Sequence, residues 1–507
     1  MEKEKNLNEI QNNFKEYDQS QLYWDVIHIN ELLEEEHPAR LLNKIVETLD
    51  LTCLYLEHSK EGNSPYHPKM MLKVLFYGYY TGLLSCRRIW DAVKYRADFI
   101  YLSAGQVPNF RTINSFRMRH LKNLPDIFSQ IVLLCVELDL VGFEYLAIDG
   151  ETIKANANFQ KNKSLSIINE EIEELSMQIG KVLEKDLEDN ESEEVKDWQK
   201  SKITKMEKKY EKLEEMRKKL EILAKKKIEK QKNRELKVEE AKPRGREKDP
   251  QKIRINLTDS ESPILQHKDG RTLPSYQHQT AGDSKYGISC AIQTTRRPDH
   301  PSDLLPLVDE AKKNTMQVFK KILADCAFGS LGVFKRIKEE RDEDFYVPDE
   351  RYKIRKTKKD KAGKFKQEEF KYDKNGNLYC PAKKIMEYIG QYKMDNTKKD
   401  IHKGIDCENC DIQYKCTDAK KRIVTIDIRT NCRKEMWKKL DSDRGKYHYL
   451  KRGPIIENIH GDDQKNRGWI QHHLRGYEKA KGEFILMRIA SNLRKMVKYG
   501  DLQLLKT

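Results

Sequence analysis

Residues 144–158 read EYLAIDGETIKANAN, and this stretch decides the fold. Its short apolar run, Leu146 to Ile148, is typical of a buried strand and ends in the carboxylate of Asp149. A second run of the same kind, Ile322 to Ala324, ends in Asp325. Because α/β enzymes place catalytic groups at the ends of buried strands, both acids are candidate site residues.

A third acid, Glu457, lies in RGPIIENIHGDDQKNRGW, where Arg452, Lys465 and Arg467 make the surroundings basic. Two Mg²⁺ or Mn²⁺ ions about 4 Å apart can activate a nucleophile, stabilise the leaving oxygen and neutralise charge on a phosphodiester. Such ions take hard oxygen ligands, mostly carboxylates from separate elements. The three acids therefore indicate a two-metal site with Asp149 as the bridging ligand. Chance placement among 82 acidic residues is the alternative.

The bulk composition favours a polyanionic partner, since the net charge is +15 and the sequence pI is about 9.0. A length of 507 residues argues for several domains. The chain contains no apolar run near the roughly 20 residues that span a bilayer, and no signal-peptide pattern, so a cytoplasmic location without membrane association is expected. The absence of a Walker-type glycine loop predicts that ATP is not required.

Residues 1–140 are expected to form an all-α module. Apolar residues at helical spacing predict helices over 68–84, 86–95 and 127–138. Thr112 is a candidate N-cap for a further helix that presents Arg117, Arg119 and His120. A basic helix of this kind can lie in a DNA groove or along phosphates, so the three are candidate DNA contacts. A solvated face of an ordinary helical bundle is the alternative.

From residue 143 the pattern changes to strands, which predicts a multidomain α/β protein. A helical insertion, residues 164–244, interrupts these strands and carries two stretches of heptad spacing. Between the stretches, Glu184 to Asp197 holds eight acidic residues against two lysines, which is typical of a loop. An antiparallel helical hairpin is therefore predicted, with an intermolecular coiled coil as the alternative.

Residues 346–435 are predicted to form a basic, Cys-rich insertion that resembles a zinc ribbon. The candidate ligands of a structural Zn²⁺ ion are Cys380, Cys407, Cys410 and Cys416. Four thiolates of which two are closely spaced match the composition of such a site. Cys432 and His402 are further candidates. Unligated buried cysteines are the alternative.

Six blocks occur in order along the chain: HPKMMLKVLFYGYYTGLLSCRRI, PNFRTINSFRMRH, AIDGETIKANAN, SYQHQTAGDSKYGI, ILADCAFGS and the long segment that begins RGPIIENIHGDDQKNRGW. Together they resemble the DDE-type transposases of bacterial insertion sequences over about residues 20–498. The resemblance implies an RNase H-like mixed sheet as the catalytic core. Its first part would be residues 141–163 and 245–345, and its C-terminal helical part residues 436–507.

The same resemblance implies a function and its site. The three catalytic acids implied are Asp149, Asp325 and Glu457. A transposase of this kind binds the terminal inverted repeats of its element in double-stranded DNA, hydrolyses phosphodiester bonds there and joins the 3′-OH ends to target DNA. Pairing two ends makes a homodimer the expected assembly. A catalytically inactive or domesticated DNA-binding derivative and a metal-dependent nuclease without strand transfer are the alternatives.

One departure from the family pattern lies beside the third acid. Three residues align with the Tyr, Arg and Glu of the family's Tyr-Arg-Glu-Lys signature: Tyr449, Arg452 and Glu457. Gln464 stands where the signature has Lys. The adjacent Lys465 is a candidate substitute, and Arg452, Lys465 and Arg467 are candidate DNA contacts. For Lys465 and Arg467, simple charge compensation of a helix surface is the rival interpretation.

Overall fold

The computed structural model describes residues 18–504 with short gaps, and these described residues form two compact units. The gaps are 21, 24–26, 57–63, 189–192, 236–248, 250–251, 358–364, 366–368, 374–375, 395–396, 428 and 502. The first unit comprises residues 1–151, 277–470 and 481–507, and the second comprises 152–276 and 471–480. Among the described residues, no helix combines the length and the apolar character that crossing a membrane requires.

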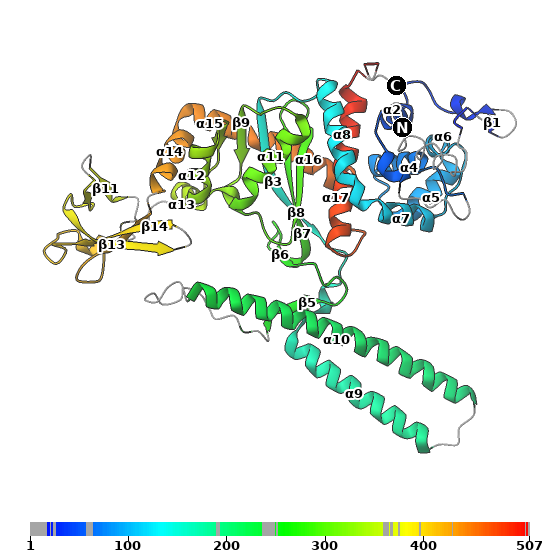
Figure 1. Cartoon of the computed structure of the whole chain (residues 1–507), viewed down its shortest axis with the longest axis horizontal. Coiled ribbons are helices and arrows are strands. Elements are labelled where there is room, and N and C mark those ends of the chain that lie inside the picture. Colours follow the sequence, from blue (N-terminus) through cyan, green and yellow to red (C-terminus); the bar gives the residue numbers. More distant parts are fainter. Residues whose placement is uncertain are drawn as a thin grey trace. The chain divides into compact units, whose positions relative to one another are not determined.

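The N-terminal part of the first unit is mainly helical (Figure 1). A short pair of strands, β1 (Leu22–Tyr23) and β2 (Ile27–His28), precedes the helices. The helices are α2 (Pro38–Glu47), α3 (Thr52–Tyr55), α4 (Pro68–Tyr80), α5 (Cys86–Tyr95), α6 (Ala97–Leu102), α7 (Phe110–Arg119) and α8 (Leu124–Glu137). The predicted cap of α7 is wrong: Asn109 caps it, its Oδ1 accepting from the backbone N–H groups of Arg111 and Thr112 at 2.9 Å.

A mixed sheet follows in the order β10-β9-β3-β7, with β8 paired to β7. Its strands are β3 (Tyr145–Lys154), β7 (Thr272–Asp283), β8 (Ser289–Thr295), β9 (Lys321–Ala324) and β10 (Asp344–Tyr346). The pairs β3–β9 and β9–β10 are parallel, and β7–β8 is antiparallel. Helices α11 (Leu304–Thr315) and α12 (Leu331–Glu340) are the connections of this region. The mixture of helices and sheet is consistent with the predicted α/β class.

The second unit contains the predicted helical hairpin, α9 (Leu165–Glu188) and α10 (Glu193–Glu235). Leu165 at the start of α9 belongs to the same apolar cluster as Ala224 late in α10, as an antiparallel pair requires. Two short antiparallel strands, β4 (Asn162–Ser164) and β5 (Arg254–Asn256), join the hairpin's ends. The predicted loop is too long, because residues 184–188 and 193–197 are helical.

Leu220 lies in the apolar cluster of this hairpin and is 1% exposed, whereas Leu223 on the same helix is 39% exposed. We expect Leu220→Ala to destabilise the hairpin by about 2–5 kcal/mol, because it removes buried methyl groups and leaves a cavity. Leu223→Ala is the matched control and should cost well under about 1 kcal/mol. Hydrogen exchange of peptides from α9 and α10 measures the difference. Equal exchange in the two variants would contradict the packing described.

The Cys-rich insertion forms an antiparallel meander in the order β11-β12-β13-β14-β15. Its strands are β11 (Lys371–Tyr372), β12 (Leu378–Tyr379), β13 (Ile385–Met394), β14 (Thr397–Gly404) and β15 (Ile423–Asp427). One face packs a small core of Phe370, Leu378, Met386, Val424 and Ile426. The basic stretch before it begins in helix α13 (Glu350–Thr357). The α-helices that follow are α14 (Thr430–Asp441), α15 (Asp443–Leu450), α16 (Arg452–Gly461) and α17 (Tyr477–Tyr499), and a short π-helix, Asp462–Asn466, lies between the last two.

Candidate active site

The parallel pairing of β3 with β9 brings the first two predicted acids together. The register pairs Ile148 with Ala324, and the next residues along the chain are Asp149 and Asp325. The prediction that the first strand ends at Asp149 is wrong, because β3 continues through Asp149 to Lys154, whereas β9 does end at Ala324, directly before Asp325. Asp325 also caps a short 3-10 helix, its Oδ1 accepting from the backbone N–H of Cys326 at 2.7 Å. This cap orients the carboxylate at the point where β9 ends, beside the carboxylate of β3.

Arg452, the first residue of α16, lies against this acidic pair. Its Nη1 is 3.3 Å from Asp149 Oδ2, and the two side chains are 21% and 19% exposed. Burial acts to lower the pKa of Arg452, but the neighbouring Asp149, Tyr449 and Asp325 act to raise it and outweigh the burial, so the pKa lies above its ordinary value. Burial also raises the pKa of the Tyr449 phenol to about 12. The guanidinium therefore stays charged and neutralises part of the negative charge of Asp149 and Asp325.

Glu457 lies one helical turn beyond Gly453 on α16, and its side chain is exposed. Its carboxylate lies next to Gly453: Glu457 Oε1 is 3.6 Å from the position that a Cβ atom on Gly453 would occupy. Among the described residues, no group of three or more His, Cys, Asp or Glu side chains is arranged to hold a metal ion. The structure thus places Asp149 next to Asp325, but these two acids and Glu457 do not together surround a metal-binding position.

A fourth carboxylate, Asp299, lies beside this strand and was not predicted. A Cβ on Gly150 would come within 2.1 Å of Asp299 Oδ2, so a larger residue at that position of β3 would have to displace the Asp299 carboxylate. Gln277 and Gln279 each donate to Asp299 Oδ1 at 2.9 Å. Burial raises the pKa of Asp299 to about 6; these hydrogen bonds oppose the rise and the charge of Asp149 adds to it. The only sequence signal was the DHPSD segment after β8.

Three of the predicted DNA contacts are buried, which corrects the prediction for them. Arg117 is 5% exposed, and its guanidinium donates to the Tyr79 hydroxyl at 3.1 Å and to Asn114 Oδ1 at 2.7 Å. His120 is 2% exposed and packs against the Phe116 ring. Their partners lie within the helical module, where a contact with DNA is sterically blocked.

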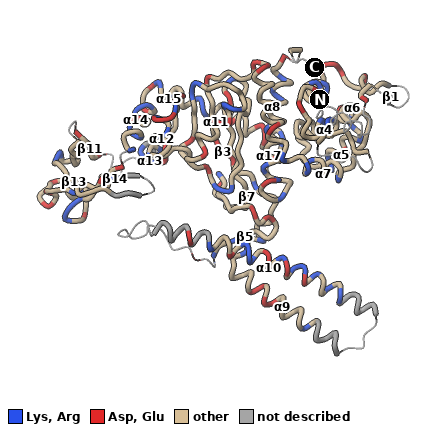
Figure 2. Tube along the Cα trace, in the orientation of Figure 1, with Lys and Arg blue, Asp and Glu red and all other residues tan. Residues whose placement is uncertain are grey.

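Arg467 is the third of these residues and is 4% exposed. It forms ion pairs with Asp462 and Asp463, and its Nη1 donates to the Met487 carbonyl oxygen at 2.9 Å. Arg119 and Lys465, by contrast, are exposed. Lys and Arg are present in every part of the chain, intermixed with acids (Figure 2), so charge alone does not identify one DNA-binding element.

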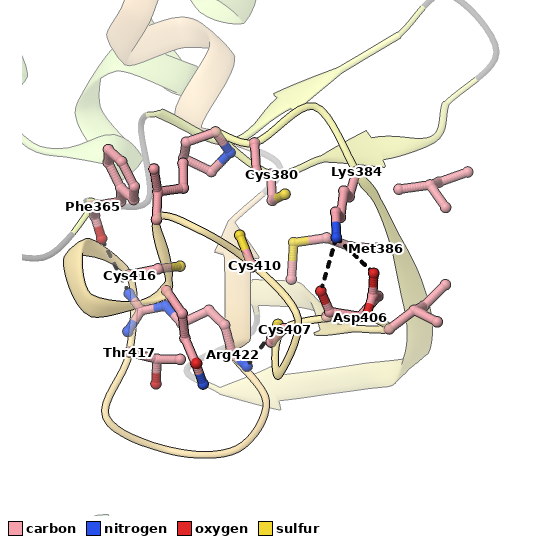
Figure 3. A pocket seen from close by; sticks show the side chains of 17 residues that line it. Phe365, Cys380, Lys384, Met386, Asp406, Cys407, Cys410, Cys416, Thr417 and Arg422 are labelled. Carbon is pink, nitrogen blue, oxygen red and sulfur yellow. Dashed lines mark hydrogen bonds and ion pairs between the residues drawn. The ribbon is translucent and has the colours of Figure 1, made fainter.

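The four predicted cysteines line a single cavity of about 30 Å³ (Figure 3). They are Cys380, Cys407, Cys410 and Cys416. The backbone N–H of Arg422 donates to Cys407 Sγ at 3.4 Å. Burial raises the pKa of the Cys416 thiol; Arg422 opposes this effect, and the other three cysteines add to it. The four sulfurs are therefore close enough to interact electrostatically.

The two alternative zinc ligands are not part of this cavity. His402 has its Nε2 at 3.1 Å from the Tyr372 hydroxyl and does not line the cavity. Cys432 lies in α14, outside the small sheet, and does not line it either. The tertiary structure thus groups the four cysteines around one cavity and leaves His402 and Cys432 out of it. The sequence spacing did not distinguish these two residues from the other candidate ligands.

Two family models match parts of the chain. Residues 27–119 match the family described as Transposase domain (DUF772), and residues 379–497 match the one described as Transposase DDE domain. The second match includes Arg452, Glu457 and all four cysteines, with Cys380 at its second residue. Asp149 and Asp325 lie outside both matched ranges. Comparison with curated proteins found no match, and comparison with solved structures found none either.

Proposed function

Because the two matches indicate a DDE-type transposase of an insertion sequence, we propose that this chain binds the ends of its element, hydrolyses phosphodiester bonds there and joins the 3′-OH ends to target DNA. The observation that carries the proposal is the register of β3 and β9, which sets Asp149 in the middle of β3 next to Asp325 at the end of β9. This placement agrees with an RNase H-like core, in which the first acid lies on an inner strand and the second follows an adjacent one.

The carboxylates of Asp149, Asp325 and Glu457 are the residues that would hold two Mg²⁺ or Mn²⁺ ions. Their oxygen donors have the hardness that these ions prefer, and the neighbouring strands β3 and β9 supply two of the carboxylates from separate elements. When bound, such ions activate the attacking water or 3′-OH and stabilise the leaving oxygen. Glu457 is exposed on a helix, so its carboxylate is accessible to solvent and to a metal ion.

Arg452 has the proposed role of holding the DNA backbone beside the acidic pair. Its guanidinium lies 3.3 Å from Asp149 and remains partly exposed. A planar guanidinium binds phosphate oxygens through two parallel hydrogen bonds, which fixes the orientation of the phosphate. The exposed cations Arg119 and Lys465 are proposed as further backbone contacts. Binding through such contacts weakens steeply as the salt concentration rises.

Cleavage of element ends tests the proposed function directly. The full chain is incubated with labelled duplexes of an element end or a scrambled sequence, in Mg²⁺, Mn²⁺ or EDTA, with supercoiled target DNA. We expect metal-dependent nicking at the end sequence and joined products, and about 10³-fold slower cleavage by Glu457→Gln with end binding retained. The exposed Glu478 supplies the control variant Glu478→Gln.

The other outcomes of this assay identify the alternative functions. End binding without any cleavage by the parent would mean a DNA-binding derivative. Cleavage without joined products would mean a nuclease without strand transfer. Sedimentation of the protein with and without end DNA tests the proposed homodimer, because pairing two ends requires two copies of the site.

We also propose that the four cysteines of the insertion hold one structural Zn²⁺ ion. Their side chains line one small cavity, and an amide N–H already donates to Cys407, as is common for zinc-bound thiolates. In the described residues the four side chains do not yet form a closed ligand set, so zinc binding would have to draw the sulfurs together. Since the pKa of Cys416 is raised, zinc binding must displace its proton and should weaken as the pH falls.

Removal of this zinc is expected to unfold the small sheet. Cys407→Ser should lower the zinc content from about one per chain to near zero and reduce the melting temperature of the insertion. Cys432→Ser, outside the cavity, is the matched control and should retain zinc. Metal analysis by mass spectrometry measures both, and a parent protein purified without chelators that holds no zinc would refute the site.

A further inference from the structure

Glu151 lies two residues beyond Asp149 on β3 and is 3% exposed. Alternate residues of a strand share a face, so Glu151 projects on the same side of the sheet as Asp149. Gln464 Nε2 donates to Glu151 Oε2 at 3.2 Å, and Arg488 Nη2 is 3.5 Å from Glu151 Oε1. A buried acid next to the acidic pair is thus connected to two other elements.

Gln464 belongs to a segment that continues the helix of the third acid. The five residues Asp462–Asn466 form a π-helix that follows α16 directly. Glu457 and Gln464 therefore lie seven residues apart on one continuous helical segment. Single π-helical turns are rare and are found frequently at functional sites, where they redirect side chains.

Buried ion pairs anchor this π-helix to α17. Asp463 pairs with Arg467 and with Arg488, and all three side chains are fully buried. Arg467 also pairs with Asp462, Nε to Oδ2 at 3.1 Å. Because unpaired charges are costly in a protein interior, these contacts hold the π-helix in one position. Arg488 contacts both Asp463 and Glu151, so it connects the anchor to β3.

The oxygen Oε1 of Glu151 is buried, and no hydrogen bond to it is found among the residues that the structure describes. Acids with a purely structural role are generally fully hydrogen-bonded, since leaving a buried acceptor unsatisfied costs free energy. The contacts of Glu151 are the 3.5 Å ion pair between Oε1 and Arg488 and the hydrogen bond from Gln464 to Oε2. The Gln464 hydrogen bond is the one that connects to the helix of Glu457.

We propose that Glu151 and Gln464 form a positioning pair that sets the location of Glu457 relative to Asp149. Gln464, which stands where the Tyr-Arg-Glu-Lys signature has Lys, then acts within the protein by donating a hydrogen bond to Glu151 on β3. The expected effect on cleavage rests on the proposed function, whereas the expected stabilisation of α16 by the Glu151–Gln464 hydrogen bond does not depend on activity. Neither residue is placed in contact with DNA or with a metal ion.

Variants of Gln464 test this pair. Gln464→Leu removes the donor, whereas Gln464→Lys keeps a donor within reach of Glu151. We expect Gln464→Leu to slow single-turnover end cleavage about 10- to 100-fold, the range typical for groups that orient metal ligands, with unchanged affinity for end DNA. Gln464→Lys should restore most of the rate. Asn458→Leu, exposed on the same helix, is the matched control and should behave as the parent.

Hydrogen exchange of residues 452–461 without DNA or metal supplies the second readout. Faster exchange in Gln464→Leu than in Asn458→Leu is expected, because the helical segment of Glu457 then keeps only the Arg452–Asp149 ion pair at its start as a described polar contact with β3. Equal exchange in the two variants would overturn the inference, whether or not the parent cleaves DNA. Unchanged cleavage by Gln464→Leu, or a loss confined to DNA affinity, would also overturn it. A parent that cleaves nothing would refute the proposed function, and the exchange data would still decide the pair.

Discussion

Replacement of Asp149 or Asp325 by Ala is expected to slow end cleavage by about 10³-fold or more, the largest effect on activity predicted for this chain. The two carboxylates follow the paired residues Ile148 and Ala324, so removing either one leaves half of the acidic pair. Each variant also removes a negative charge next to Arg452, so end DNA should bind as tightly as to the parent or more tightly.

Cleavage rate and DNA affinity are therefore measured separately for these variants. Glu144→Gln is a suitable control, because Glu144 lies next to the start of β3 and pairs with Lys320 and Lys321 at the sheet's opposite end from the acidic pair. It should cleave at the parent's rate. If Asp149→Ala and Asp325→Ala both cleaved like this control, the assignment of the two acids would be wrong.

Arg488→Met is expected to cause the largest loss of stability, about 3–5 kcal/mol. Arg488 is completely buried in α17 and contacts Glu151 and Asp463, which are also buried. Burial lowers the pKa of this guanidinium, and the charge of Glu151 opposes the shift. Without Arg488, Glu151 loses its ion pair and Asp463 retains only Arg467, so uncompensated negative charge stays in the interior.

Thermal unfolding of the full chain measures this loss, and the melting temperature of Arg488→Met should fall by on the order of 10 °C. Arg494→Met is the control on the same helix, since Arg494 is 36% exposed and lies 3.5 Å from Asp462. A partly exposed ion pair contributes about 0–1 kcal/mol. Melting temperatures that fall equally in the two variants would show that the buried ion cluster does not stabilise the fold.

Several elements followed from local sequence alone. Helix α5 begins and ends at the predicted residues 86 and 95, and α4 begins at Pro68 as predicted. The heptad spacing correctly predicted that the two helices of the insertion pack together. Helical periodicity and a proline in the first turn depend on residues within a few positions of one another, which is why a sequence pattern can report them.

The electrostatic assignments were less predictable. Arg117 and Arg119 are two residues apart on one basic helix, yet the first is buried and the second is exposed. Arg117 meets the hydroxyl of Tyr79, 38 residues away, and Arg467 meets a carbonyl oxygen 20 residues away. A cation's role depends on whether such a partner is present, and the composition of its own helix does not contain that information.

The sequence by itself determined that Asp149 and Asp325 each follow a short buried apolar run, and that four cysteines are grouped in one insertion. Only the tertiary structure decided that these strands are parallel neighbours, that Asp299 lies against Gly150, and that Gln464 meets Glu151 across 313 residues. The physical reason is the range of the interactions. Strand and helix propensities act between near neighbours, whereas the burial of a charge and the choice of its partner depend on which distant segments pack together.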